Sequence, residues 1–414
     1  MSINHLNTSF TLPCGATIKN RLVKAAMTER LSNEQLQPTS AHHHIYERWA
    51  DTDVGLQITG NVMVDPTYRE SAGNVYIGNE DIIPFLETWS AIGKKNDGHI
   101  WPQISHPGRQ TSRFLSNRPL APSAVQLKKL GLFGKPKAMS SSDVEQTLEA
   151  FVKTASICKK GGFTGVQFHA AHGYLLSQFL SPLTNHRTDQ WGGNLDNRSR
   201  LLRSIIDESR KVLGDDFPIS IKLNSSDFQR GGFTEEESLE VIRMLDGKID
   251  LLELSGGTYE RLVFFEAKGD MSTVKESTKR REAYFIAFAS KVREVSSVPL
   301  MITGGFRSFD FCNEVLANKE LDLIGMARPF ITDIEHMKNF LHGRYPKLSN
   351  PDIKTGVKMI DDASEGGYYA RQLIRLAEGK ELDSKVKPIK SALFFTSHEF
   401  KLSRKNKASN ITSI

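Results

Sequence analysis

The stretch Gly165-Val-Gln-Phe-His169-Ala-Ala-His172-Gly-Tyr174 shows the pattern that decides the fold, a short apolar run ending in polar side chains. Such runs are typical of parallel strands that are buried on both faces. Seven similar runs occur at 21–26, 54–61, 100–105, 218–223, 249–254, 299–303 and 321–326. Segments with helical periodicity follow them, for example at 143–160, 194–212, 234–245 and 280–295. Repeated strand–helix alternation predicts an α/β fold, a (β/α)8 TIM barrel.

The 414 residues exceed what one barrel needs, and we place the excess in three parts. We assign residues 1–345 to a single barrel domain with an N-terminal hairpin cap and an enlarged loop after the third strand, at 107–142. Residues 346–400 are predicted to form a C-terminal helical extension, with a helix at 364–378. The basic segment 401–414 is expected to be a disordered tail.

Composition excludes several classes of protein. With 39% hydrophobic and 25% charged residues, the chain is not a disordered protein, a collagen or a disulfide miniprotein. Three widely spaced cysteines argue against a disulfide framework, a zinc site or an iron–sulfur cluster, and fit a reducing compartment. Without a signal-like start or a long apolar run, we expect a cytoplasmic protein with no membrane partner.

The net charge of +6 gives only weak evidence for an anionic partner. Four of the 54 basic residues and none of the 48 acidic residues lie in 401–414, so the rest of the chain is nearly neutral. We therefore expect no nucleic-acid partner.

Active sites of this fold lie at the carboxyl ends of the strands, and phosphate groups often bind after the seventh and eighth. Gly304-Gly305 follows the seventh run, and Ala327-Arg328 follows the eighth. Glycine lets backbone N–H groups approach an anion, and Arg offers a planar cationic fork. This combination favours a phosphate site over simple tight turns.

His169, His172 and Tyr174 allow three interpretations on spacing alone. The histidines could hold a metal ion, with Asp189 or His186 as a third ligand. They could be structural residues. They could also donate hydrogen bonds to an oxyanion, with Tyr174 as an acid.

A longer motif begins at the same histidine. The stretch 169–198, HAAHGYLLSQFLSPLTNHRTDQWGGNLDNR, closely resembles the signature of the old yellow enzyme family of FMN-dependent ene-reductases. Further matching segments follow in the family's order over about residues 10–340: Leu12-Pro-Cys-Gly, Lys19-Asn-Arg21, Ala26-Met-Thr28, Gln103, His106-Pro-Gly-Arg109, Gly304-Gly305 and Gly325 with Arg328-Pro-Phe330. The resemblance implies bound FMN and NADH or NADPH as co-substrate.

The resemblance also implies roles for individual residues. Near the flavin ring it places Ala26, Met27, Thr28, Gly60 and Gln103, with Thr28 near O4 and N5 and Gln103 at the pyrimidine edge. At the flavin phosphate it places Gly304, Gly305, Ala327 and Arg328. It assigns the substrate oxygen to His169 and His172, and proton delivery to Tyr174.

The main departure from the family pattern is a single basic residue. Lys222 stands where the family usually has Arg, as the cation near flavin N1. We disfavour a purely structural role for it, because burying an unpaired ammonium is costly. Asn185, Arg187 and Asp189 are expected to pin the loop after the fourth strand.

The expected function is ping-pong hydride transfer from NADH or NADPH to FMN and then to a small electron-poor acceptor. Such acceptors include α,β-unsaturated carbonyl and nitro compounds. The alternatives are a metal-dependent barrel hydrolase and a flavin barrel acting on RNA. The sequence leaves open the nicotinamide preference and the oligomeric state.

Overall fold

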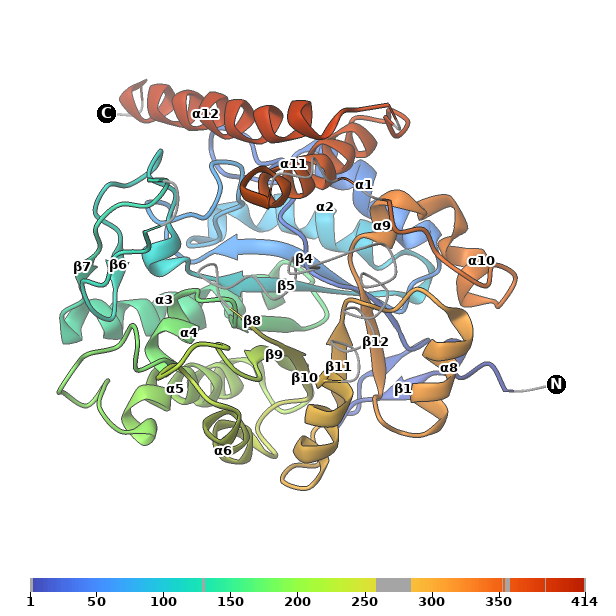
Figure 1. The fold of residues 1–414 in the computed structure, drawn as a ribbon, viewed down its shortest axis with the longest axis horizontal. Coiled ribbons are helices and arrows are strands. Elements are labelled where there is room, and N and C mark those ends of the chain that lie inside the picture. The colour runs from blue at the N-terminus through green and yellow to red at the C-terminus, as the bar shows by residue number, and fades with distance from the viewer. Residues whose placement is uncertain are drawn as a thin grey trace.

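The computed structural model in Figure 1 describes residues 3–128, 131–257, 284–351, 353, 358–383 and 385–412. Within these ranges, parallel strands close into a barrel in the order β10-β11-β12-β3-β4-β5-β8-β9. The strands are β3 (Leu22–Lys24), β4 (Leu56–Met63), β5 (His99–Ser105), β8 (Val166–Ala170), β9 (Ile219–Asn224), β10 (Leu251–Ser255), β11 (Leu300–Thr303) and β12 (Leu323–Met326). Each predicted run overlaps one of them, so the barrel prediction is confirmed.

Helices connect the strands around the outside of the barrel (Figure 1). They are α1 (Ser40–Asp51), α2 (Ile83–Gly93), α3 (Ser141–Lys160), α4 (Leu175–Leu180), α5 (Leu195–Leu213), α6 (Glu235–Leu245), α8 (Phe309–Ala317), α9 (Pro329–Thr332) and α10 (Met337–Leu341). Short 3-10 helices occupy His5–Asn7, Glu80–Ile82, Lys95–Asp97, Gly108–Gln110 and Ile334–His336. Of the helix predicted at 280–295, residues 284–293 are helical, and residues 280–283 lie outside the described ranges.

The barrel interior changes from apolar to polar along its axis. A compact apolar cluster fills the amino-terminal half, formed by Leu12, Ile18, Val23, Leu56, Ile58, Trp101, Leu251, Met301 and Leu323. Leu12 and Ile18 come from the antiparallel hairpin of β1 (Phe10–Thr11) and β2 (Thr17–Ile18), which therefore closes this end as expected. The interior polar side chains Gln103, Lys222 and Glu253 lie beyond this cluster, toward the carboxyl ends of the strands.

Two additions lie beside this framework. The loop at 107–142 carries β6 (Leu120–Ala121) and β7 (Lys137–Ala138). The C-terminal extension consists of α11 (Lys358–Ala377) and α12 (Pro388–Thr412), which pack against each other, with α11 also against α1 and α9 (Figure 1). Because α12 continues through 401–412, this segment is helical and not the disordered tail we expected.

None of the helices in the described ranges combines the length and apolarity needed to cross a bilayer.

Candidate active site

The structure brings His169, His172 and Tyr174 together at the carboxyl end of β8. His169 Nε2 lies 3.3 Å from His172 Nδ1, and His172 Nε2 lies 2.7 Å from the Ser255 hydroxyl. The Tyr174 ring centroid is 4.6 Å from that of His169. Two imidazoles and a phenol therefore share one region of the barrel mouth.

A strained turn carries these side chains. His172 and Gly173 adopt left-handed φ angles of 61° and 75°, which is costly for a residue with a Cβ. The Asn224 side chain accepts a hydrogen bond from the His172 N–H at 3.1 Å, and Gln110 donates to the His172 carbonyl at 3.2 Å. Holding both backbone groups of His172 keeps the turn in one conformation.

Burial determines the charge state of the two histidines. It is the main cause that holds the pKa values of His169 and His172 well below the ordinary value, and the nearby Lys222 ammonium lowers both further. At neutral pH each imidazole is therefore uncharged and has one N–H to donate.

The proposed third metal ligands do not join this pair. Asp189 forms a bidentate ion pair with Arg187, and Asn185 donates to the carbonyls of Phe179 and Trp191 at 2.8 Å each, so these residues pin the loop as predicted. Over the described part of the chain, no group of three His, Cys, Asp or Glu residues is placed to hold a metal ion.

Lys222 is buried next to an acid that sequence reasoning missed. In strand register it lies between His169 of β8 and Glu253 of β10. Its ammonium lies 2.8 Å from the Glu253 carboxylate, and the two side chains are 7% and 0% exposed. Our sequence argument against a structural lysine assumed an unpaired ammonium, and the ion pair with Glu253 shows that this assumption was wrong. The sequence signal that could have revealed Glu253 is an isolated acid in the apolar run Leu-Leu-Glu-Leu.

Gln103 joins the same buried network. Its amide donates to Gln167 Oε1 at 2.6 Å, and the Gln167 amide donates to Glu253 Oε2 at 2.9 Å. A continuous polar chain thus runs from β5 through β8 and β10 to Lys222.

The segment after β3 meets a second carboxylate absent from our sequence prediction. The Thr28 hydroxyl donates to Glu70 Oε1, and the Tyr174 hydroxyl donates to Glu70 Oε2. Ala26 and Met27 are half-buried beside Thr28. Glu70 was missed because it lies well inside the loop after β4, and we considered only residues next to strand ends.

Gly60 packs closely against the segment after β3. Its N–H donates to the buried Glu29 carboxylate at 2.8 Å, and a Cβ at this position would lie 2.0 Å from Glu29 Oε2. It would also lie 2.3 Å from the Met27 carbonyl oxygen. Packing against Glu29 and Met27 is thus sufficient to require glycine here.

At the other side of the mouth, Gly304 and Gly305 have φ values of 99° and 92°, which favour glycine. A Cβ built on Gly304 would meet no described atom within 4 Å, so space is open beside it. Ala327 is half-buried. Arg328 forms an ion pair of 2.6 Å with Glu365 of α11, and its guanidinium lies 5.0 Å from the Tyr369 ring centre. The extension therefore contacts the cation that we expected to bind phosphate.

The carboxyl ends of the strands also hold buried polar atoms that have no hydrogen-bond partner among the described residues. They are Asn61 Oδ1, Ser105 Oγ, His169 Nδ1 and Thr303 Oγ1, from β4, β5, β8 and β11. Such atoms need a partner, because a buried polar group without one is costly. Together with the open space beside Gly304, they fit a polar ligand such as FMN.

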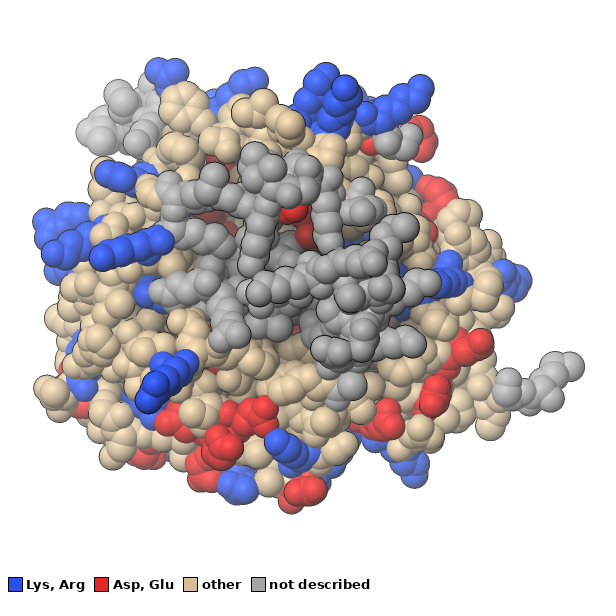
Figure 2. All heavy atoms as spheres, in the orientation of Figure 1, with Lys and Arg blue, Asp and Glu red and all other residues tan. Residues whose placement is uncertain are grey.

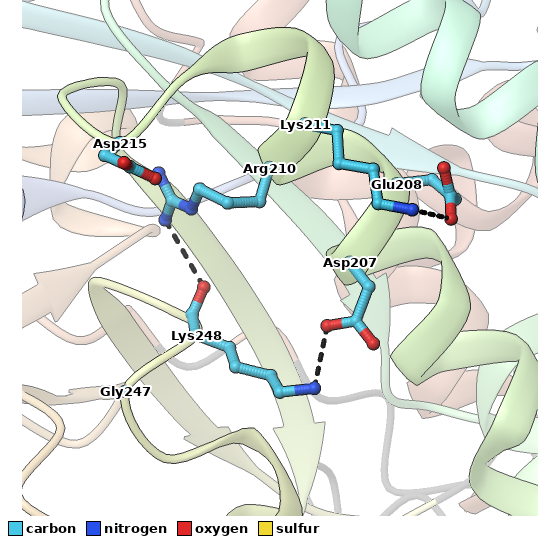
Figure 3. Close-up of a pocket in the computed structure, with 7 residues that line it drawn as sticks. All are labelled: Asp207, Glu208, Arg210, Lys211, Asp215, Gly247 and Lys248. Atoms are coloured by element: carbon cyan, nitrogen blue, oxygen red, sulfur yellow. Dashed lines mark hydrogen bonds and ion pairs between the residues drawn. The ribbon is translucent and has the colours of Figure 1, made fainter.

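A pocket of about 500 Å³ lies elsewhere, between α5 and the turn before β10 (Figure 3). Its charged side chains form ion pairs, Lys248 with Asp207 at 2.8 Å and Lys211 with Glu208 at 2.6 Å. It is lined from the amino-terminal side of β10, and we assign it no role. Figure 2 shows basic side chains along the edge that carries α12 and a mixture of both signs along the opposite edge.

Comparisons with known proteins agree with this arrangement. A sequence profile of the NADH:flavin oxidoreductase / NADH oxidase family matches residues 10–347. The NADH-dependent flavin oxidoreductase nadA of Aspergillus parasiticus is 35% identical over 390 residues, covering 89% of this chain and 83% of that protein. The NADH-dependent flavin oxidoreductase iliE of Neonectria sp. is 32% identical over 406 residues, covering 92% of this chain, which spans only 53% of that protein.

A solved old yellow enzyme homologue from Zymomonas mobilis supports the fold, with a TM-score of 0.68 at 21% identity, covering 83% of this chain and 94% of that one. The profile match, which takes in the whole barrel, establishes that the chain belongs to the NADH:flavin oxidoreductase / NADH oxidase family.

Proposed function

We propose that the chain is an FMN-dependent NAD(P)H oxidoreductase that reduces small electron-poor acceptors, such as α,β-unsaturated carbonyl or nitro compounds. The observation that carries the proposal is the grouping of two neutral imidazoles and a phenol at the barrel mouth. When bound, FMN supplies hydride chemistry, accepting a hydride from NADH or NADPH and passing it to the acceptor.

The residues proposed to hold FMN surround this group. Lys222 supplies an ammonium whose charge Glu253 balances, Gln103 supplies an amide edge, and the segment after β3 contributes Ala26, Met27 and Thr28. Gly60 lets this segment approach β4 closely and would lie beside the bound flavin. Gly304, Gly305, Ala327 and Arg328 hold the phosphate, for which Arg328 must share its guanidinium with Glu365.

His169 and His172 bind the acceptor through its activating oxygen. Hydride addition at the β-carbon places negative charge on that oxygen, and N–H donors aimed there stabilise the charge as it develops. Neutral imidazoles suit this role because they donate an N–H hydrogen bond and keep the proton. Tyr174 then delivers a proton to the α-carbon from its hydroxyl, and such general acids contribute about 10²- to 10⁴-fold to rates.

The test separates the two half-reactions by stopped flow. Tyr174→Phe should leave flavin reduction by the nicotinamide intact and slow acceptor reduction by at least about a hundredfold. Equal loss in both half-reactions would reject the acid role.

The histidine assignment has its own test. His169→Ala and His172→Ala should each weaken the binding of phenol-like ligands, measured by titration of the flavin absorbance. An unchanged affinity in both variants would reject the proposed oxygen site. Purified protein without FMN absorbance would reject the cofactor assignment.

A further inference from the structure

Glu70 connects two hydroxyl groups that come from different strands. Thr28 follows β3 and Tyr174 follows β8, whereas Glu70 lies in the 65–74 loop after β4. Each oxygen of the Glu70 carboxylate accepts one of the two hydroxyl protons. We propose, building on the proposed function, that Glu70 is a positioning residue that sets the direction of the Tyr174 and Thr28 hydroxyls.

The loop around Glu70 is held in shape by its own polar groups. The Arg69 guanidinium donates to the Ala72 carbonyl at 3.1 Å, and the Ser71 N–H donates to Asn74 Oδ1 at 2.8 Å. The Asn74 amide donates to the Asn61 carbonyl at 3.2 Å and to Glu70 Oε1 at 3.4 Å. The carboxylate is thus presented by an ordered loop and tied to the end of β4, as precise positioning requires.

The donors and acceptors at Glu70 fix which way each hydroxyl proton points. An ionised carboxylate only accepts, and each hydroxyl has one proton to donate. With both protons turned toward Glu70, Tyr174 and Thr28 present oxygen lone pairs to the rest of the site. The negative charge of Glu70 also opposes loss of the Tyr174 proton to solvent, because a phenolate would form beside a like charge. Glu70 therefore keeps Tyr174 protonated and holds its O–H in a resting direction, and the O–H must rotate from Glu70 toward the bound acceptor to deliver the proton.

Substitutions at Glu70 can separate charge from shape. Glutamine has nearly the same shape but offers one acceptor and one donor group, so it cannot accept both hydroxyl protons in the same way. Glu70→Gln also removes the negative charge. Glu70→Asp keeps the charge on a shorter side chain, and we expect it to rescue part of the effect.

The experiment follows Tyr174 ionisation in the holoenzyme by tyrosinate absorbance, taking Tyr174→Phe as the baseline. In Glu70→Gln the Tyr174 transition should move to lower pH, and acceptor reduction should slow by about tenfold or more. In the Tyr174→Phe background, Glu70→Gln should slow acceptor reduction by less than about twofold. Asp65→Asn is the matched control, since Asp65 accepts from the Thr67 N–H at 2.7 Å in the same loop.

Two outcomes would overturn the inference. One is an unmoved Tyr174 transition in Glu70→Gln, and the other is an equal shift in Asp65→Asn, which would assign the effect to general loop charge. Failure of the proposed function would give a different result. The Tyr174→Phe enzyme would then reduce the acceptor at the wild-type rate, whether or not the Glu70 variants shift the Tyr174 titration.

Discussion

Glu399 of α12 links the C-terminal extension to the loops that carry Thr28 and Glu70. Its carboxylate accepts from Arg30 Nε at 2.8 Å, from the Ser71 hydroxyl at 2.6 Å and from the Ala72 N–H at 3.0 Å. Arg30 in turn donates to the Thr28 carbonyl at 2.9 Å. Glu399→Ala would remove the acceptor of three hydrogen bonds at once.

The expected loss of free energy follows from the burial of the Glu399–Arg30 ion pair. The side chains of Glu399 and Arg30 are only 8% and 16% exposed, so solvent does not fully replace the lost partner. Breaking a buried ion pair from one side typically costs about 3–5 kcal/mol. Arg30 keeps its bond to Thr28 and its contact with the Phe395 ring, so we expect a cost near the lower limit, about 3 kcal/mol. This is roughly a hundredfold change in the equilibrium for local opening.

Hydrogen exchange measured by mass spectrometry can locate this loss. In Glu399→Ala, peptides from 69–74 and from α12 should exchange about a hundredfold faster, while barrel strands such as β9 keep their protection. Glu378→Ala is the control, because Glu378 pairs with Lys380 on the surface and should contribute less than about 1 kcal/mol. Exchange in 69–74 that is unchanged by Glu399→Ala would refute the proposed link.

Three further predictions concern buried or shared charges. Glu253→Gln should lower the free energy of unfolding in urea by about 3 kcal/mol, because it leaves the Lys222 ammonium unpaired. The double variant Lys222→Met, Glu253→Met should recover most of that loss, and a Glu253→Gln variant as stable as the wild type would contradict the prediction. Glu365→Gln should tighten FMN binding several-fold, measured by flavin fluorescence, because the carboxylate competes with phosphate for Arg328; weaker binding would argue against the competition. Burial lowers the pKa of His42 to about 3, against about 6.5 when unfolded. Below pH 6.5 the unfolded chain therefore takes up a proton that the native one does not, and stability should fall by about 1.4 kcal/mol per pH unit, a slope that His42→Gln should reduce.

The barrel could be predicted because its signals are local and repeated. Each strand is a short apolar run, and the polar residues that follow mark the carboxyl end, which is how His169, His172 and Tyr174 were found together. The helix caps are also local signals, as at α3, where Ser140 is the cap and Asp143 three residues later is its partner. The helix at 401–412 was not predicted, because this polar segment shows no apolar period that would indicate one.

The carboxylates around the site could not be predicted in the same way. Glu70, Glu253 and Glu365 meet their partners across strands, loops and the extension, so no spacing along the chain relates an acid to the group it contacts. Sequence reasoning gave roles to their partners, the Tyr174 phenol, the Lys222 ammonium and the Arg328 guanidinium, without finding the acid that contacts each one. A strand-end search thus finds the groups that we propose to meet a ligand, whereas the acids that contact them are found only in the folded arrangement.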